Sequence, residues 1–203
     1  MYNVNLKVLN ELAKLAPKDD ILYYLKGVQV NIYPDHSIYT VTNGHYLVMY
    51  RADIQQYDAD DVTMIIPADV LLKTKPWSKA CDNCSLKPDG EQWIIQDTVF
   101  KPVDATYPDI IRVLPSPENL SADNPAQALD IDYLYTLNKC YQKISGKKNG
   151  NLRIMYNKNE KSGAFLDGGD QLIAVLMPLV KDAGTTPEWY DHMAKPVKQV
   201  KAA

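Results

Sequence analysis

The sequence predicts an α+β fold in which a unit of one helix plus antiparallel strands is repeated about three times. A helix is expected at three places, residues 6–16, 67–75 and 131–144. About three short apolar segments separated by turn residues follow each helix, a pattern typical of antiparallel strands. Repeated units of this kind favour an antiparallel sheet that carries its helices on one face.

The first unit begins with the helix over residues 6–16. Asn5 can cap its start, and leucines recur along it at helical spacing. Asn43-Gly44 suits a tight hairpin, because both residues tolerate a positive φ. Strands are expected on both sides of that turn and before them, at residues 26–33, 37–42 and 45–51.

The other two units each open with a strand. Pro67 directly follows the first of these strands and is well suited to the first position of the second helix. Asp130 is placed to cap the third helix. The strands expected in the second unit are 62–66, 85–87, 92–96 and 98–103, and those in the third are 126–129, 152–157, 163–166 and 172–177.

These units predict a division of the chain into four parts. Residues 1–105 form a domain of two units, and residues 126–180 a partial second domain of one unit. Residues 106–125 are expected to link them, because 116–125 is rich in Pro, Ser, Asn and Asp. Residues 181–203 are polar and carry several lysines, which indicates a mobile, mildly basic tail.

Composition excludes several classes of protein. The 203 residues are 46% hydrophobic and 23% charged, which is typical of a folded protein, and carry a formal net charge of −3. That charge argues against a protein that grips nucleic acid by overall charge, although a local basic face is compatible with it. No apolar run approaches the roughly 20 residues of a membrane span, and no signal peptide is evident, so a cytoplasmic protein is expected.

No catalytic or cofactor site is expected. Cys81 and Cys84 have the C-x-x-C spacing of zinc and redox sites, but the third cysteine lies on a predicted helix and the histidines are scattered. The pair also falls in a polar loop before a strand rather than at a helix start. A structural role is therefore favoured over a metal site, and a metal site over redox chemistry.

Lysines lie on all three predicted helices. If the helices share one face, that face would be positive enough to contact DNA phosphates; the alternative is an ordinary solvated surface. The residues concerned are Lys7, Lys14, Lys73, Lys139 and Lys143.

Four segments carry a resemblance to a known family: Leu22–Gly27, Val41–Leu47, Tyr107–Pro115 and Val175–Leu179. They resemble segments of the bacterial sliding clamp, the beta subunit of DNA polymerase III. Leu22–Gly27 resembles the Tyr-Tyr-Leu-Asn-Gly segment of that family, and Val41–Leu47 resembles its Ala-Thr-Asp-Gly-His-Arg-Leu motif. Tyr107–Pro115 resembles Phe-Pro-Asp-Tyr-Arg-Arg-Val-Leu-Pro, which joins the middle and last domains, and Val175–Leu179 resembles the closing Val-Met-Pro-Met segment. The resemblance spans about residues 22–180 and is most specific at Tyr107–Pro115.

The resemblance implies a DNA-clamp-like protein without catalytic residues or cofactors, which tethers a polymerase to duplex DNA without reading its sequence. Replication proteins dock short, partly hydrophobic peptides into a pocket of such clamps. Carried over by motif, the pocket would consist of Leu25, Thr42, Gly44, His45, Leu47, Pro108, Arg112, Val113, Val175, Met177, Pro178 and Leu179.

The departures from the family also matter. Family chains contain six units, so four copies of a three-unit chain would be needed for a ring of twelve. Tyr46 stands where the family has Arg, which would alter peptide preference. Two hypotheses follow: a processivity factor that assembles around DNA, of a compact type that would suit a phage, or a non-encircling module that binds clamp-binding peptides as a decoy.

Overall fold

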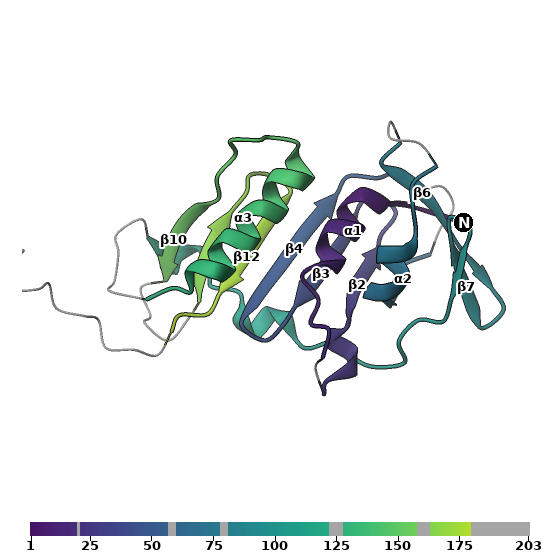
Figure 1. Cartoon of the computed structure of the whole chain (residues 1–203), viewed down its shortest axis with the longest axis horizontal. Coiled ribbons are helices and arrows are strands. Elements are labelled where there is room, and N and C mark those ends of the chain that lie inside the picture. Colours follow the sequence, from purple (N-terminus) through teal and green to yellow (C-terminus); the bar gives the residue numbers. More distant parts are fainter. Residues whose placement is uncertain (20, 57–59, 78–80, 122–127, 158–162, 180–203) are drawn as a thin grey trace, which may run out of the picture.

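The computed structural model describes residues 1–19, 21–56, 60–77, 81–121, 128–157 and 163–179. Its strands form two antiparallel sheets, with the orders β1-β6-β7-β8 and β5-β2-β3-β4-β12-β11-β10-β9. The helices α1, α2 and α3 lie on one face of the eight-stranded sheet (Figure 1). This arrangement confirms an α+β chain with antiparallel sheets.

The chain begins with a strand that the sequence did not predict. β1 (Tyr2–Asn5) leads directly into α1 (Leu6–Ala13). The side chain of Asn5 accepts a hydrogen bond from the backbone N–H of Val8 at 3.0 Å, so it caps α1 as expected. α1 ends at Ala13 rather than Ala16, and its inner side is fully buried at Leu6, Leu9 and Leu12.

β2 (Gly27–Ile32), β3 (Ser37–Thr42) and β4 (Tyr46–Ala52) follow α1, after the 3₁₀ turn η1 (Tyr23–Leu25). β5 (Val62–Pro67) then leads into α2 (Ala68–Lys73). Pro67 is therefore both the last residue of β5 and the N-cap of α2, so the helix begins one residue later than predicted. β6 (Asn83–Asp89), β7 (Gln92–Ile95) and β8 (Thr98–Phe100) complete this part of the chain.

The two halves of this region exchange strands. β5, which precedes α2, pairs with β2, the first strand after α1. β1, which precedes α1, pairs with β6, the first strand after α2. Gly27 permits close pairing with β5, because a Cβ there would lie 2.7 Å from the carbonyl oxygen of Ile66. The exchange lets α1 and α2 pack side by side over one core.

The last part of the chain extends the larger sheet. Asp130 caps α3 (Ile131–Ser145) by accepting from the N–H groups of Asp132 and Tyr133 at 2.9 and 3.1 Å. β10 (Arg153–Asn157), β11 (Ala164–Asp167) and β12 (Leu172–Leu176) follow α3. β12 pairs with β4, with Val175 opposite Leu47, so the two regions share one continuous sheet.

The segment predicted to link the regions contains regular structure. It includes the 3₁₀ turns η2 (Ile110–Val113) and η3 (Pro117–Asn119) and the two-residue strand β9 (Leu120–Ser121), which pairs with the end of β10. Of the strand predicted at 126–129, Ala128 forms an isolated bridge with Leu179. Residues 126–127, the end of the predicted linker and the predicted tail lie outside the described residues.

Candidate functional site

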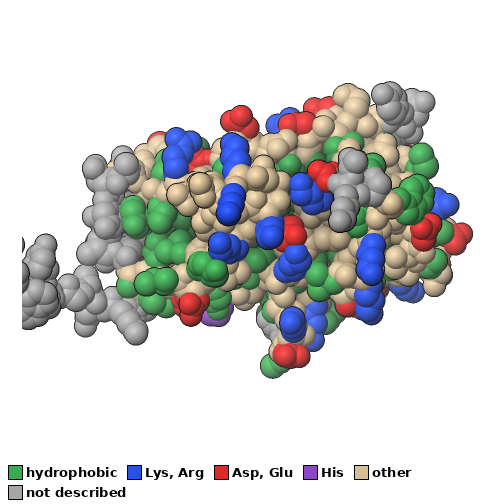
Figure 2. Space-filling view, turned by 45° about the horizontal axis from the view of Figure 1, so that its top comes forward, with side chains coloured by type: hydrophobic (Ala, Val, Ile, Leu, Met, Phe, Trp, Pro, Cys, Tyr) green, Lys and Arg blue, Asp and Glu red, His purple; other side chains and the backbone are tan. Residues whose placement is uncertain are grey.

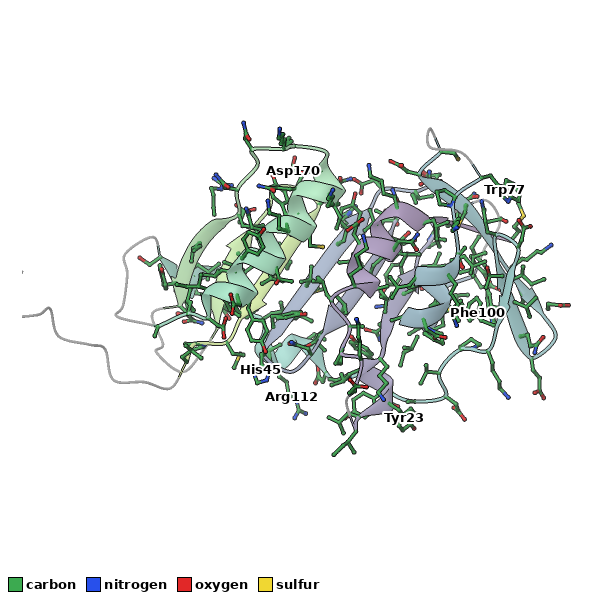
Figure 3. All side chains as sticks on the ribbon, in the orientation of Figure 1. Tyr23, His45, Trp77, Phe100, Arg112 and Asp170 are labelled. Atoms are coloured by element: carbon green, nitrogen blue, oxygen red, sulfur yellow. The ribbon has the colours of Figure 1, made fainter. Side chains whose placement is uncertain are left out.

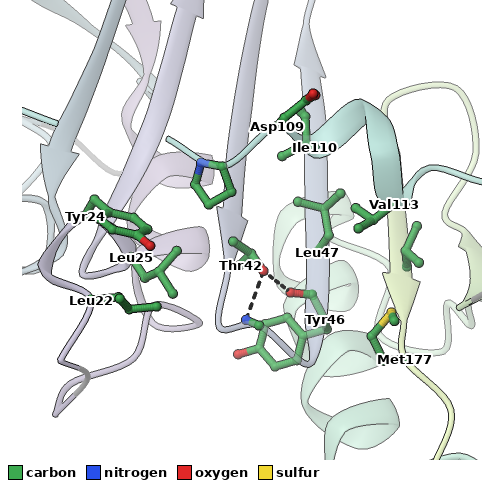
Figure 4. Close-up of a pocket in the computed structure, with 13 residues that line it drawn as sticks. Leu22, Tyr24, Leu25, Thr42, Tyr46, Leu47, Asp109, Ile110, Val113 and Met177 are labelled. Atoms are coloured by element: carbon green, nitrogen blue, oxygen red, sulfur yellow. Dashed lines mark hydrogen bonds between the residues drawn. The ribbon is translucent and has the colours of Figure 1, made fainter. Parts of the chain in front are cut away.

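An apolar pocket lies beside the junction of β4 and β12. It has a cavity volume of about 250 Å³. Three segments far apart in the sequence build it: the η1 and β3–β4 region, the η2 segment, and the end of β12 (Figure 4). The lining residues are Leu22, Tyr24, Leu25, Thr42, Gly44, Tyr46, Leu47, Pro108, Asp109, Ile110, Val113, Val175 and Met177.

Local hydrogen bonds fix the turn that forms the centre of this pocket. The hydroxyl of Thr42 donates to the carbonyl of Tyr46 at 2.6 Å and accepts from the N–H of Gly44 at 3.1 Å. The side chain of Asn43 accepts from the N–H groups of His45 and Tyr46, both at 3.0 Å. Gly44 has φ +86°, which favours glycine. The pocket wall is thus preformed.

A buried tyrosine attaches the η2 segment to β3. The pairing of β2 with β3 ends at Gln29 and Thr40, so β2 does not pair with Thr42. The N–H of Thr42 instead donates to the hydroxyl of Tyr107 at 3.1 Å. Tyr107 is buried, and this burial raises the pKa of its hydroxyl well above the usual value. This bond holds Pro108, the next residue, at the pocket.

The η2 turn is held mainly by Asp109, the residue that caps its start. Asp109 accepts a hydrogen bond from the N–H of Ile111 at 3.2 Å and forms an ion pair with Arg112 at 3.0 Å. The Arg112 side chain is 84% exposed, and Figure 3 shows it at the outer edge of the molecule. Asp109 is therefore among the residues that line the pocket, whereas Arg112 is not.

The third wall comes from the end of β12. The N–H of Met177 donates to the carbonyl of His45 at 2.9 Å, which continues the β4–β12 ladder by one residue. Val175 is buried in the sheet, whereas Met177 is 39% exposed. A flexible thioether at the rim of an apolar cavity can adjust to different apolar ligands.

Tyr46 lies in the pocket, where the related family motif has Arg. Its hydroxyl donates to the carbonyl of Leu15 at 2.7 Å, which ties the β3–β4 turn to the segment after α1. Burial raises the pKa of Tyr46 to about 12, so the side chain is neutral at physiological pH. Its ring also meets that of Tyr133 edge-on at 5.3 Å. The pocket centre is therefore uncharged and aromatic.

Eight of the twelve residues predicted for the pocket line it: Leu25, Thr42, Gly44, Leu47, Pro108, Val113, Val175 and Met177. Four do not. His45 is exposed and stacks on Tyr133 with ring centroids 5.6 Å apart, and Arg112 points outward (Figure 3). Pro178 and Leu179 lie past the pocket, where the N–H of Leu179 donates to the carbonyl of Ala128 at 2.8 Å.

Five lining residues were not predicted: Leu22, Tyr24, Tyr46, Asp109 and Ile110. Each lies inside one of the motifs that predicted the others, so a signal was present. Leu22 and Tyr24 flank Tyr23 in η1, whose 3₁₀ geometry sends neighbouring side chains in different directions. Counting along a motif could not separate inward from outward side chains there.

Of the predicted DNA-facing lysines, Lys14 caps the end of α1 and the others lie within α1, α2 or α3. On the face shown in Figure 2, basic and acidic side chains are interspersed. Ion pairs join three of these lysines to neighbouring carboxylates: Lys7 to Asp82 at 3.4 Å, Lys14 to Glu11 at 2.6 Å, and Lys73 to Asp69 at 3.1 Å. Lys139 lies over the ring of Tyr135, 5.3 Å from its centroid.

The cysteines and the helices bear on metal binding and membrane insertion. Cys81, Cys84 and Cys140 are free cysteines, and burial raises the pKa of Cys84 and Cys140 to about 12. No cluster of three potential metal ligands occurs within the described residues. Among the helices of that part of the chain, none has the length and apolar character needed to cross a bilayer.

Comparison with known proteins identifies the fold. No family model and no curated protein matches the sequence. Among solved structures, a DNA polymerase sliding clamp from Pseudomonas aeruginosa with ligand aligns with a TM-score of 0.63 at 17% identity, over 88% of this chain and 65% of that chain. The H. pylori beta clamp in complex with diflunisal gives a TM-score of 0.64 at 12% identity, over 87% and 64% of the two chains.

The fold is therefore that of the sliding clamps. More narrowly, the chain is structurally similar to bacterial DNA polymerase III beta subunits over most of its length, at low sequence identity. It spans 65% of the length of the P. aeruginosa clamp.

Proposed function

We propose that this chain is a sliding-clamp-like processivity factor that docks replication proteins through the pocket beside β4 and β12. The observation that carries the proposal is the composition of this pocket from three distant segments, each resembling a clamp motif. A further P. aeruginosa sliding clamp has been solved bound to griselimycin, with a TM-score of 0.58 at 15% identity over 88% of this chain and 64% of that chain. Clamps of this fold thus bind ligands.

The pocket chemistry supports a short apolar peptide segment as the ligand. Leu25, Leu47 and Val113 provide aliphatic walls, and the neutral ring of Tyr46 lies between them (Figure 4). Asp109 is the charged residue of the lining set, and a carboxylate is a hydrogen-bond acceptor for peptide N–H groups. A mostly apolar cavity with few polar groups is typical of sites that bind by burying a hydrophobic anchor.

A binding titration tests the pocket directly. A fluorescein-labelled peptide carrying the clamp-binding segment of a bacterial replicative polymerase is titrated with the protein, and anisotropy is measured. Met177→Ala removes a rim contact and should weaken binding by about 1–3 kcal/mol, or about 5- to 150-fold. Val99→Ala on β8 is the matched control, because Val99 is exposed like Met177 but lies outside the pocket.

Two outcomes would contradict the pocket assignment. The first is an unchanged affinity for Met177→Ala while the wild-type protein binds. The second is an equal loss for Val99→Ala, which would mean that binding does not occur at this site. A wild-type protein that fails to bind the peptide at all would reject peptide docking as the function.

DNA association is the second part of the proposal. Lys139 and Lys143 both lie on α3. Their two positive charges on one helix support phosphate contacts in this proposal. The double variant Lys139→Glu, Lys143→Glu should bind duplex DNA more weakly, with a flatter dependence of log affinity on log salt. Lys87→Glu on β6 is the control, and an equal effect of that substitution would reject a specific DNA face.

The ion pairs on this surface favour a second candidate function. Lys7, Lys14 and Lys73 are each paired with a carboxylate, which reduces the local positive charge available to phosphates. A module that keeps the peptide pocket but does not encircle DNA, acting as a clamp decoy, would need no basic face. Peptide binding combined with no DNA retention at low salt would select this alternative.

A further inference from the structure

A second surface, which shares no residue with the peptide pocket, lies on the outer side of α3. Here a groove of about 300 Å³ runs between α3 and β10, and no charged side chain lines it. Ile131 and Tyr135 on α3 are 77% and 63% exposed, and Ile154 on β10 is 37% exposed. Hydrophobic side chains gather at this end of the molecule (Figure 2). Large apolar groups that share one surface are typical of an interface.

α3 has an exposed apolar side in addition to the side that packs against the rest of the protein. Leu137 and Cys140 are buried toward the sheet and α1. Ile131, Leu134 and Tyr135, by contrast, line the groove, at the spacing of one helix face. α3 therefore has apolar residues on two sides, and only one of these sides is covered by another helix within the described residues.

The topology of the chain indicates what kind of element fits there. The order strand, helix, three strands occurs as β1–α1–β2–β3–β4, β5–α2–β6–β7–β8 and β9–α3–β10–β11–β12. In the first two runs, the first strand after each helix pairs with the strand that leads into the other helix, and the two helices pack together. β10 pairs instead with the two-residue β9 of its own run, and α3 has no such neighbour in the described part of the chain.

We propose that this surface binds the same surface of a second copy of the chain, so that two α3 helices pack antiparallel across a two-fold axis. The reciprocal packing of α1 and α2 provides the precedent, because a reciprocal relation between two equivalent units is what a two-fold axis produces. Ile131 and Tyr135 of each copy enter the groove of the other.

The charges beside the groove suit this arrangement. Asp132 and Lys139 lie seven residues apart, on the same side of α3 and near its exposed stripe. An antiparallel helix pair centred near Tyr135 places the acidic end of each stripe opposite the basic end of the other. The surface is thus self-complementary in charge as well as apolar, which favours a second copy over an unrelated partner.

Sedimentation equilibrium of the full chain between about 1 and 100 µM tests this interface. The wild-type protein should associate reversibly, and Ile131→Glu should weaken this association at least about tenfold. Ile111→Glu is the matched control, because Ile111 and Ile131 are both 77% exposed and Ile111 lies in η2, away from α3. Circular dichroism melts establish that both variants are folded.

The outcomes are distinct from those of the pocket experiment. A wild-type chain that stays monomeric throughout this range overturns the interface, as does an Ile131→Glu variant that keeps the wild-type mass. An equal loss of association for Ile111→Glu also overturns it. Ile131→Glu should retain wild-type affinity for the clamp-binding peptide, because the groove and the pocket share no residue.

Discussion

The hydrogen bond between Thr42 and Tyr107 can be removed without changing the shape of the buried ring. Tyr107→Phe deletes the hydroxyl that accepts from the N–H of Thr42 at 3.1 Å. Tyr107 is only 6% exposed, so the ring keeps its packing in the variant. The N–H of Thr42 then has no acceptor among the described residues, because β2 does not extend far enough to pair with it.

The expected loss of unfolding free energy depends on how deeply the N–H of Thr42 is buried. A fully buried N–H without a partner costs about 1–3 kcal/mol. Thr42 is half-buried, so water can satisfy part of this group, and the expected loss is near the lower end, about 1 kcal/mol. For a chain of this size, a loss of about 1 kcal/mol lowers Tm by about 2–4 °C.

Urea unfolding followed by circular dichroism measures this loss. With an m-value of about 1–3 kcal/mol/M, the midpoint should fall by roughly 0.3–1 M while m stays constant. Tyr23→Phe is the control, because the hydroxyl of Tyr23 is exposed and donates at 3.4 Å to the carbonyl of Asp104. A Tyr107→Phe loss below about 0.3 kcal/mol, or no greater than that of Tyr23→Phe, would refute the reasoning.

Two further predictions concern titratable side chains. Burial raises the pKa of Tyr46, Cys84 and Cys140 to about 12, from ordinary values of 10.0 and 9.0. The contribution of these three groups to the free energy of unfolding is therefore complete below about pH 9 and is lost as pH rises toward 12. The urea midpoint should fall accordingly, and a midpoint that stays constant from pH 8 to 11 would contradict these shifts. In a thiol titration with Ellman's reagent, exposed Cys81 should react at once, and Cys84 and Cys140 only in urea; immediate reaction of all three would contradict their burial.

Local signals predicted much of the fold. The cap at Asp130 and the apolar spacing of the following residues gave α3 nearly its full length, and the Asn43-Gly44 turn lies where expected. β1 and β9 were missed, because strands of four and two residues carry little periodic signal of their own. β1 exists because β6, far away in the sequence, supplies its hydrogen-bonding partner.

The candidate pocket was likewise predicted only in part from the sequence. Motif resemblance brought together residues from three distant segments, and eight of its twelve residues line one cavity. His45 and Arg112 do not line this cavity, because their side chains contact Tyr133 and Asp109 instead. Such side-chain directions depend on neighbours that sequence spacing alone does not specify.

The β4–β12 pairing also has a consequence for how the protein folds. The hydroxyl of Tyr50 and the side chain of Gln171, joined across this junction, are 121 positions apart in the sequence. Closing so long a loop is entropically costly and slow, so this pairing should form late, after the hairpin of β3 and β4. During synthesis on the ribosome, β4 would present an open edge until β12 emerges, and this edge is where misassembly between nascent chains would begin.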